Sequence, residues 1–260
     1  VVSYNLVARD AAGGAVITAS HNPPQWNGYK YKPDYGGSAS PEVVAELEAE
    51  IQRAEATGRA SHIPLEEAER QGLVERFDPE PTYLNHVASL VDLASIRASG
   101  LRVAVDSMHG AGAGYLSKLL SGGACEVTEL RAEPDPEFPG MSQPEPLAHN
   151  LAELMATVAA GAADVGLATD GDADRLGVVD ETGRFLTTLQ TFALLCFHQL
   201  EFLGERGPLV RSITMTSMID RLGEIYGVPV IVTPVGFKYL GPVMMSEDAL
   251  AAGEESGGYG

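Results

Sequence analysis

The sequence predicts an α/β protein with more than one domain, and three observations support this. Short runs rich in β-branched residues alternate along the chain with segments of helical spacing, a pattern typical of mixed α/β layers. The chain has 260 residues, which exceeds the usual size of a single hydrophobic core. Hydrophobic residues make up 45% of it and charged residues 20%, a composition typical of globular proteins and too apolar for a disordered chain.

Residues 1–99 are expected to form the first domain. A strand is predicted at 15–18, where β-branched residues follow a Gly-Gly turn. Ser40 is a typical helix N-cap, and the helical pattern that follows it, with one apolar face, continues until Gly58. A second helical pattern, over 83–94, ends at a Ser-Gly pair that marks the first boundary.

Residues 100–205 are expected to form the second domain. Its centre is a long loop at 132–146, because five prolines in that stretch exclude regular structure and suggest a functional loop. A Gly-Pro break then precedes the third domain, 206–260. The remaining predicted elements of these two domains are strands at 101–106, 164–169, 176–179, 209–214 and 228–233, and helices at 147–158, 192–203 and 218–226.

Charge and cysteine content exclude several classes of function. Asp and Glu total 36 against 17 Lys and Arg, and a formal net charge of −19 disfavours binding to nucleic acid or to an anionic membrane. No stretch approaches roughly eighteen consecutive apolar residues, and no signal peptide is recognisable. Cys125 and Cys196 form no C-x-x-C pair, so neither a disulfide framework nor a zinc site is indicated. We expect a cytoplasmic protein in a reducing compartment.

The first candidate site is the segment TASHNPPQWNGYK, residues 18–30. Ser20 follows a strand expected to be buried, and two prolines prevent a helix from continuing. An Asn-Gly turn then starts a second extended run, which allows Ser20 and Lys30 to flank one loop. A hydroxyl beside His21 and a lysine suits covalent phosphoryl or acyl transfer. The alternative is a polar turn whose side chains only satisfy backbone groups.

The second candidate site is the acidic loop TDGDADR, residues 169–175. Asp170, Asp172 and Asp174 alternate along it, and three close carboxylates need a cation between them. Oxygen ligands select a hard ion, Mg²⁺ or Ca²⁺. An EF-hand is rejected, since Arg175 replaces its required glycine and strands are predicted on both sides, although Glu181 falls at its twelfth position. A solvated acidic turn remains the alternative.

Two further loops carry weaker signals. Residues 109–114 follow a strand, precede a helix and are rich in glycine, with Glu129 beyond them, but the third glycine of a dinucleotide fingerprint is missing. Close strand–helix packing is therefore favoured there over a pyrophosphate site. Glu254 and Ser256 lie between glycines and could bind sugar hydroxyls, and the turn at Gly236 could present Lys238 to an anion.

The segments TASHNPPQWNGYK, DGDADR and GEESGG, in this order, resemble the α-D-phosphohexomutase superfamily, and most closely its phosphoglucomutase/phosphomannomutase group. The resemblance extends over essentially the whole chain. It implies consecutive three-layer α/β/α domains with mixed sheets and similar topology. It also implies an isomerase that interconverts hexose 1-phosphate and hexose 6-phosphate through a phosphoserine and glucose 1,6-bisphosphate. Glucose is the expected hexose, with mannose or glucosamine as alternatives.

The resemblance also implies roles for individual residues. Ser20 would carry the phosphoryl group, with His21, Lys30 and Arg175 as the other catalytic residues and Lys30 as an acid/base candidate. Mg²⁺ would be bound by Ser20, through a phosphoseryl oxygen, and by the three aspartates of the acidic loop. The residues expected to bind the phosphosugar substrate are Glu254, Ser256, Gly236 and Lys238.

The sequence departs from the family pattern in three ways. The family's fourth domain carries an R-x-S-G-T-type phosphate loop, which does not occur here, and the opening strand of its first domain is missing. Gly258 stands where some members have a histidine. We therefore expect an internal fragment, or the ordered part of a longer enzyme, incomplete in domains I and III and lacking domain IV. Such a chain should bind Mg²⁺, turn over little and tend to self-associate.

Two functions of other classes remain open at this stage. One is a calcium-binding module without catalysis, which would need helices around Asp170 and would not use Ser20. The other is a dinucleotide-dependent oxidoreductase that uses the loop at 109–114. Neither accounts for all three motifs, and the sequence makes no prediction of the oligomeric state.

Overall fold

The computed structural model describes residues 1–58 and 62–260, and the contacts within it divide the chain into two compact units. The first unit consists of residues 1–16 and 30–87, and the second of residues 17–29 and 88–260. The loop that carries Ser20, residues 18–28 (the serine loop), therefore belongs to the second unit, with the acidic loop, although the strands that flank it lie largely in the first. None of the described helices is long and apolar enough to cross a membrane.

The first unit has a small sheet and little buried surface. Strands β1 (Gly13–Ile17) and β2 (Tyr29–Pro33) pair, and the helices are α1 (Val2–Ala8), α2 (Pro41–Thr57), α3 (Leu65–Arg70) and most of α4 (Glu80–Leu90). The predicted start and end of α2 are confirmed, since the Ser40 hydroxyl accepts a hydrogen bond from Val43 N and Gly58 adopts a left-handed conformation.

Two predictions in this region are wrong. The strand before Ser20 is not buried, because the side chains of β1 are at most half-buried and Ile17 is 63% exposed. The apolar face predicted for α2 is covered only in part, since Val43 and Leu47 are half-buried and no residue of that helix is fully buried. The helical pattern at 83–94 is in fact interrupted, because the Asp92 carboxylate accepts a hydrogen bond from Ser95 N and starts a new helix, α5 (Leu93–Ala98).

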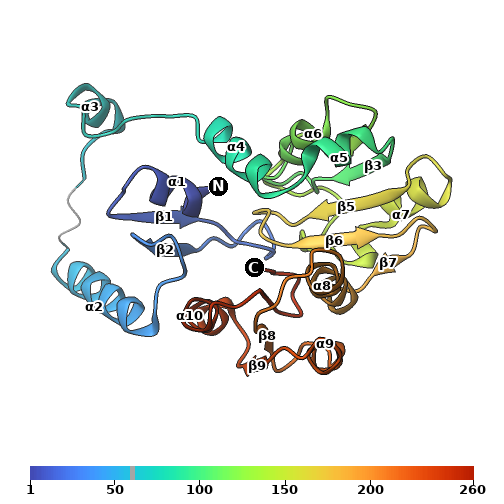
Figure 1. Ribbon diagram of the computed structural model, residues 1–260. Helices are drawn as coiled ribbons and strands as arrows, with labels where there is room; N and C mark the ends of the chain where they lie inside the picture. The colour runs from blue at the N-terminus through green and yellow to red at the C-terminus, as the bar shows by residue number, and fades with distance from the viewer. Residues whose placement is uncertain (59–61) are drawn as a thin grey trace. The chain divides into compact units, whose positions relative to one another are not determined.

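The larger sheet of the second unit confirms the three-layer prediction (Figure 1). Its strand order is β4-β3-β5-β6-β7, with β3, β4 and β5 parallel and β6 and β7 antiparallel additions. The strands are β3 (Arg102–Asp106), β4 (Glu126–Leu130), β5 (Val165–Thr169), β6 (Leu176–Val179) and β7 (Phe185–Leu186).

Helices cover both faces of this sheet, as the alternation of residues in β3 requires. Val103 and Val105 face α5 and α6 (Tyr115–Leu120), whereas Ala104 faces α7 (Ala152–Ala159). Helix α7 begins later than predicted, after a 3₁₀ turn at Ala148–Asn150. The proline-rich stretch 132–146 contains no helix or strand, as predicted.

The second sheet of this unit is parallel, with the order β10-β8-β9: β8 (Leu209–Ser212), β9 (Val230–Thr233) and β10 (Ala251–Gly253). Helix α10 (Phe237–Glu247) packs on one face. On the other lie α9 (Met218–Tyr226) and α8 (Thr188–Phe197), which continues as a π-helix, His198–Phe202.

Helix α8 packs with elements on both sides of the predicted boundary at 205–206. Phe192, Cys196 and Leu200 are packed in the core of the second sheet, with Leu209 and Ile219. The domain boundaries themselves stay predictions. The helix also begins earlier than predicted, at a capping box formed by Thr187 and Gln190.

Candidate functional site

The acidic loop connects two antiparallel strands, β5 and β6, and brings its three aspartates together. One carboxylate oxygen from each of Asp170, Asp172 and Asp174 lies within 4.8 Å of the others. Asp170 is fully buried, Asp172 is half-buried and Asp174 is exposed. Strands on both sides exclude the helix–loop–helix of an EF-hand, so the structure supports the rejection of that alternative.

The surroundings of Asp170 fit a hard cation. Its Oδ1 accepts hydrogen bonds from the backbone nitrogens of Asp174 and Arg175, at 2.9 and 3.0 Å. Its buried Oδ2 accepts no hydrogen bond from the residues that the structure describes, and Arg175 Nε lies 3.8 Å away. Burial, and then the carboxylates of Asp174 and Asp172, raise the pKa of Asp170 to about 7. A divalent ion bound by these oxygens would compensate the buried negative charge of Asp170 and reduce its repulsion with the other two carboxylates.

The serine loop is fastened to the acidic loop. Thr18 N donates to Gly28 O at 3.0 Å, which closes the loop, and the Thr18 hydroxyl donates to Asp172 Oδ2 at 2.9 Å. Ser20 N in turn donates to Thr18 Oγ1 at 2.7 Å, and Ser20 has a positive φ of 55°. A Cβ on Gly171 would lie only 2.9 Å from Ser20 O, so the backbones of the two loops are in close contact.

The Ser20 hydroxyl is in contact with a histidine. Ser20 Oγ lies 3.2 Å from His21 Nδ1, and His21 Nε2 lies 3.5 Å from Glu145 Oε1. Burial, and next the Arg175 guanidinium, lower the pKa of His21, although nearby carboxylates oppose this. A neutral imidazole with its proton on Nε2 can accept a proton from Ser20 at Nδ1.

The sequence analysis missed Glu145, although it identified the proline-rich loop that carries it. Arg175 Nη1 donates to Glu145 Oε1 at 2.8 Å, and both side chains are mostly buried. Gly171 N donates to Pro144 O, which ties this loop to the acidic loop. The only sequence signal was the run of prolines, which marked a rigid loop without indicating which of its side chains matters.

The glycine-rich loop at 109–114 is closely packed at Gly110, but against the backbone of the acidic loop and not between strand and helix as predicted. A Cβ on Gly110 would lie 2.8 Å from Gly171 O and 2.9 Å from Asp170 O, so the glycine allows the two loops to meet. Glu129 accepts a hydrogen bond from Gly114 N at 2.7 Å and others from the Ser107 and Ser117 hydroxyls. The Glu129 carboxylate thus accepts the hydrogen bond of the amide at the start of α6, which a pyrophosphate would need. This disfavours a dinucleotide there, and with it the oxidoreductase alternative.

The segment GEESGG, residues 253–258, forms a closed loop next to Arg175. The Ser256 hydroxyl donates to Glu254 Oε1 at 2.7 Å, and Glu254 N donates to Gly258 O at 3.1 Å. Leu176 N donates to Gly257 O at 3.2 Å, so the strand that follows the acidic loop is bonded directly to this segment.

Glu255 is a second residue that sequence analysis missed, and it holds this loop on the second sheet. Its carboxylate accepts hydrogen bonds from the Ser212 and Thr214 hydroxyls, and its carbonyl accepts one from Thr188. Although burial acts in the opposite direction, the hydroxyl bonds from Thr214 and Ser212 hold the pKa of Glu255 below its usual value. The carboxylate is therefore an anchor and not a free ligand.

The structure does not bring every predicted residue into this cluster. Lys30 belongs to β2 in the first unit, and its proximity to Ser20 stays a prediction. Gly236 precedes α10 with a φ of 116°. Lys238, in the first turn of that helix, has its ammonium 5.1 Å from the Tyr239 ring. Their contact with substrate also stays a prediction.

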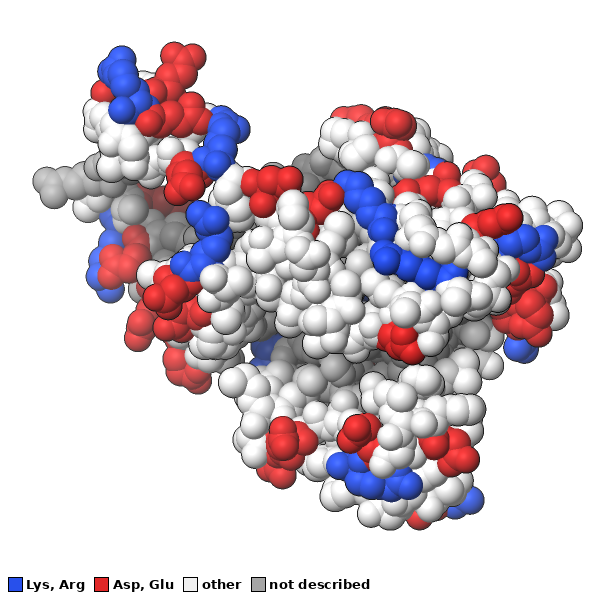
Figure 2. All heavy atoms as spheres, turned by 45° about the horizontal axis from the view of Figure 1, so that its top comes forward, with Lys and Arg blue, Asp and Glu red and all other residues white. Residues whose placement is uncertain are grey.

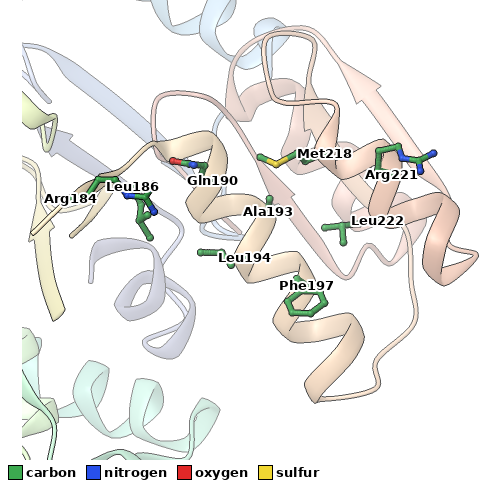
Figure 3. Close-up of a pocket in the computed structure, with 9 residues that line it drawn as sticks. All are labelled: Arg184, Leu186, Gln190, Ala193, Leu194, Phe197, Met218, Arg221 and Leu222. Carbon is green, nitrogen blue, oxygen red and sulfur yellow. The ribbon is translucent and has the colours of Figure 1, made fainter. Parts of the chain in front are cut away.

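A cavity of about 490 Å³ lies elsewhere, between α8, α9 and β7 (Figure 3). It contains none of the predicted site residues, and its lining is mainly apolar, which does not suit a phosphosugar. Its lining residues are Arg184, Leu186, Gln190, Ala193, Leu194, Phe197, Met218, Arg221 and Leu222. Acidic and basic side chains are interspersed over the face drawn in Figure 2, and no single acidic region dominates it.

Three family models match the chain in order. They are the α/β/α domains I, II and III of phosphoglucomutase/phosphomannomutase, at residues 1–58, 81–183 and 190–260. The third match starts within α8, in agreement with the packing of that helix.

Individual relatives agree with this. A protein from Methanopyrus kandleri named as a probable phosphoglucosamine mutase is 36% identical over 94% of this chain and 51% of its own. A phosphoglucomutase/phosphomannomutase from Thermococcus kodakarensis is 36% identical over 96% of this chain and 53% of its own. A crystal structure from Thermus thermophilus, described as a phosphomannomutase, matches with a TM-score of 0.89 and 36% identity, over 100% of this chain and 57% of that one. The chain spans about half the length of the curated relatives it matches.

Proposed function

This chain belongs to the phosphoglucomutase/phosphomannomutase family. We propose that it acts as a phosphohexomutase in which Ser20 carries the phosphoryl group. The observation that carries this proposal is the attachment of the serine loop to the acidic loop, through the 2.9 Å hydrogen bond from Thr18 to Asp172. This attachment keeps the Ser20 backbone against Gly171, between the aspartates.

Phosphoryl transfer proceeds in two steps, from Ser20 to the sugar and from the sugar back to Ser20. A hydroxyl oxygen of the hexose phosphate attacks the phosphorus on Ser20, the bond between phosphorus and Ser20 Oγ breaks, and Ser20 Oγ takes up a proton as the sugar hydroxyl gives up its own. The resulting bisphosphate then donates its other phosphoryl group to Ser20. The serine proton passes to His21 Nδ1, 3.2 Å away, and the departing sugar oxygen takes up a proton.

The residues of the acidic loop are proposed to hold Mg²⁺, together with Ser20. A bound Mg²⁺ supplies positive charge for the phosphoryl oxygens, which otherwise face the carboxylates of Asp170, Asp172 and Asp174. Arg175 adds a second positive group next to this loop, and its own pairing with Glu145 limits its freedom.

We propose a hexose phosphate as substrate, bound by Glu254 and Ser256, with glucose 1,6-bisphosphate as activator and intermediate. The hydrogen bond from Ser256 to Glu254 presents a carboxylate and a hydroxyl side by side, which suits vicinal sugar hydroxyls. Lys30 and Lys238 are proposed to bind phosphate oxygens. Cys125 and Cys196 are both buried, and we propose a cytoplasmic location.

Intact-mass measurement tests this proposal. The protein is incubated with Mg²⁺ and glucose 1,6-bisphosphate, and one phosphoryl group should be added to the wild type and none to Ser20→Ala. Ser38→Ala, an exposed serine, is the control and should be labelled like the wild type. Label on a residue other than Ser20 would refute the assignment. Parallel incubations with the mannose and glucosamine bisphosphates compare the three sugars.

A further inference from the structure

We propose that Glu145 is a positioning residue that holds His21 and Arg175 in place for phosphoryl transfer at Ser20. This inference rests on the proposed function and adds to it a residue from the proline-rich loop.

The contacts of Glu145 place one carboxylate between two functional side chains. Its Oε1 lies 2.8 Å from Arg175 Nη1 and 3.5 Å from His21 Nε2. The side chains of Glu145, Arg175 and His21 are 21%, 14% and 29% exposed, so water competes weakly for these contacts. Glu145 therefore restricts both groups through a single oxygen atom.

For His21, the contact determines which nitrogen faces Ser20. Of the two tautomers of the ring, a carboxylate opposite Nε2 favours the one that carries its proton on that nitrogen. Nδ1 then keeps its lone pair and lies 3.2 Å from Ser20 Oγ, ready to accept the serine proton. Without Glu145 the ring could rotate away from Ser20, because the residues that the structure describes offer Nε2 no other ion-pair partner.

For Arg175, the hydrogen bond to Glu145 provides a partner outside the acidic loop. Its Nε lies 3.8 Å from the buried Asp170 Oδ2, which accepts no hydrogen bond in the described part of the chain. If Glu145 were neutral, the guanidinium could close on Asp170 and occupy an oxygen needed by the metal. Glu145 thus keeps Arg175 close to the acidic loop without letting it replace the cation.

The backbone of Glu145 is itself rigid, as a positioning role requires. Proline residues flank it on both sides, and Asn150 Nδ2 donates to the carbonyls of Gln143 and Glu145, each at 2.8 Å. Gly171 N donates to Pro144 O at 3.2 Å. The carboxylate is therefore presented from a loop that is fixed to the loop it serves.

The test compares Glu145→Gln, which removes the charge at nearly constant shape, with Glu145→Asp, which keeps it. Glu137→Gln removes an exposed charge from the same loop and is the matched control. The rate of phosphoryl incorporation from glucose 1,6-bisphosphate is measured in single turnovers over a range of donor concentrations, with melting curves for every variant.

We expect Glu145→Gln to slow transfer at saturating donor about 10- to 100-fold, while the half-saturating donor concentration changes by less than about twofold. Glu145→Asp should recover a substantial part of the rate, and Glu137→Gln should match the wild type.

Each other outcome counts against a different statement. A wild type that takes up no phosphoryl group overturns the proposed function and this inference with it. A labelled wild type, with Glu145→Gln labelled equally fast, overturns this inference alone. It is also overturned if the Gln and Asp variants lose rate equally, or if both lose their melting transition, because Glu145 would then be only structural.

Discussion

Replacing Gly110 with alanine should disturb the acidic loop from outside it. The added Cβ would lie 2.8 Å from Gly171 O and 2.9 Å from Asp170 O, where ordinary contacts begin at 3.4 Å. Both neighbours are backbone atoms, so no side chain can rotate away, and the two loops must separate by about 0.6 Å to restore normal contact. Gly110 does not have a positive φ, so the effect is one of contact and not of backbone strain.

Overpacking of this kind costs about 1–3 kcal/mol. For a protein of this size the melting temperature should therefore fall by about 2–12 °C, measured by thermal denaturation. Because Asp170 O is one of the atoms displaced, the Mg²⁺ affinity, measured by isothermal titration calorimetry, should weaken by about tenfold.

Gly241→Ala is the matched control. Gly241 lies within α10, has no positive φ and has nothing within 4 Å of the position of an added Cβ. Alanine there gains about 0.5–1 kcal/mol of helix propensity, which the steric restriction on a residue before Pro242 offsets, and Mg²⁺ binding should be unchanged. The reasoning is refuted if Gly110→Ala melts within 1 °C of the wild type, which corresponds to a loss of about 0.3 kcal/mol or less in the free energy of unfolding, and binds Mg²⁺ equally well.

Three further predictions concern single side chains. Asp172→Asn should lower Mg²⁺ affinity and slow phosphoryl transfer by orders of magnitude with the fold retained, and an unchanged Mg²⁺ titration would contradict the site. The hydroxyl of Thr182 is the main cause that lowers the pKa of Asp180 from 3.8 to about 2, so this carboxylate stabilises the fold above pH 4. The wild type should melt above Asp180→Asn by a constant margin from pH 7 to 5, and this margin should fall steeply between pH 3.8 and 2; a constant margin down to pH 2 would contradict the prediction. Burial raises the pKa of Cys196 from 9.0 to about 12, so at pH 8 iodoacetamide should alkylate it about a thousandfold more slowly in the folded than in the unfolded protein, as read by mass spectrometry.

Local sequence signals predicted the elements that local chemistry determines. Ser40 and Gly58 fixed the ends of α2, because capping depends on the few residues around each end. The spacing of Asp170, Asp172 and Asp174 predicted a cluster, because a tight loop between strands keeps alternate side chains close together.

Features that depend on distant contacts could not be read in this way. Helical spacing in α2 predicted one apolar face, but whether such a face is buried depends on a partner surface, and the helix has no buried residue. Nothing in the local sequence shows that Glu145 would meet His21, which lies more than a hundred positions earlier. Similarly, the Gly-Pro break suggested a boundary after α8, although Phe192 packs with residues beyond that break.

The hydrogen bond from Leu176 to Gly257 has a consequence for how a ligand must behave. It joins β6, which begins where the acidic loop ends, to the loop proposed to hold the sugar, and Glu255 anchors that loop to the second sheet. A shift of one loop would therefore pull on the other, because their backbones are joined. If the proposed mechanism holds, the bisphosphate would present its two phosphoryl groups to Ser20 without these loops moving apart. It would instead release Glu254 and Ser256 and turn around between loops that stay joined.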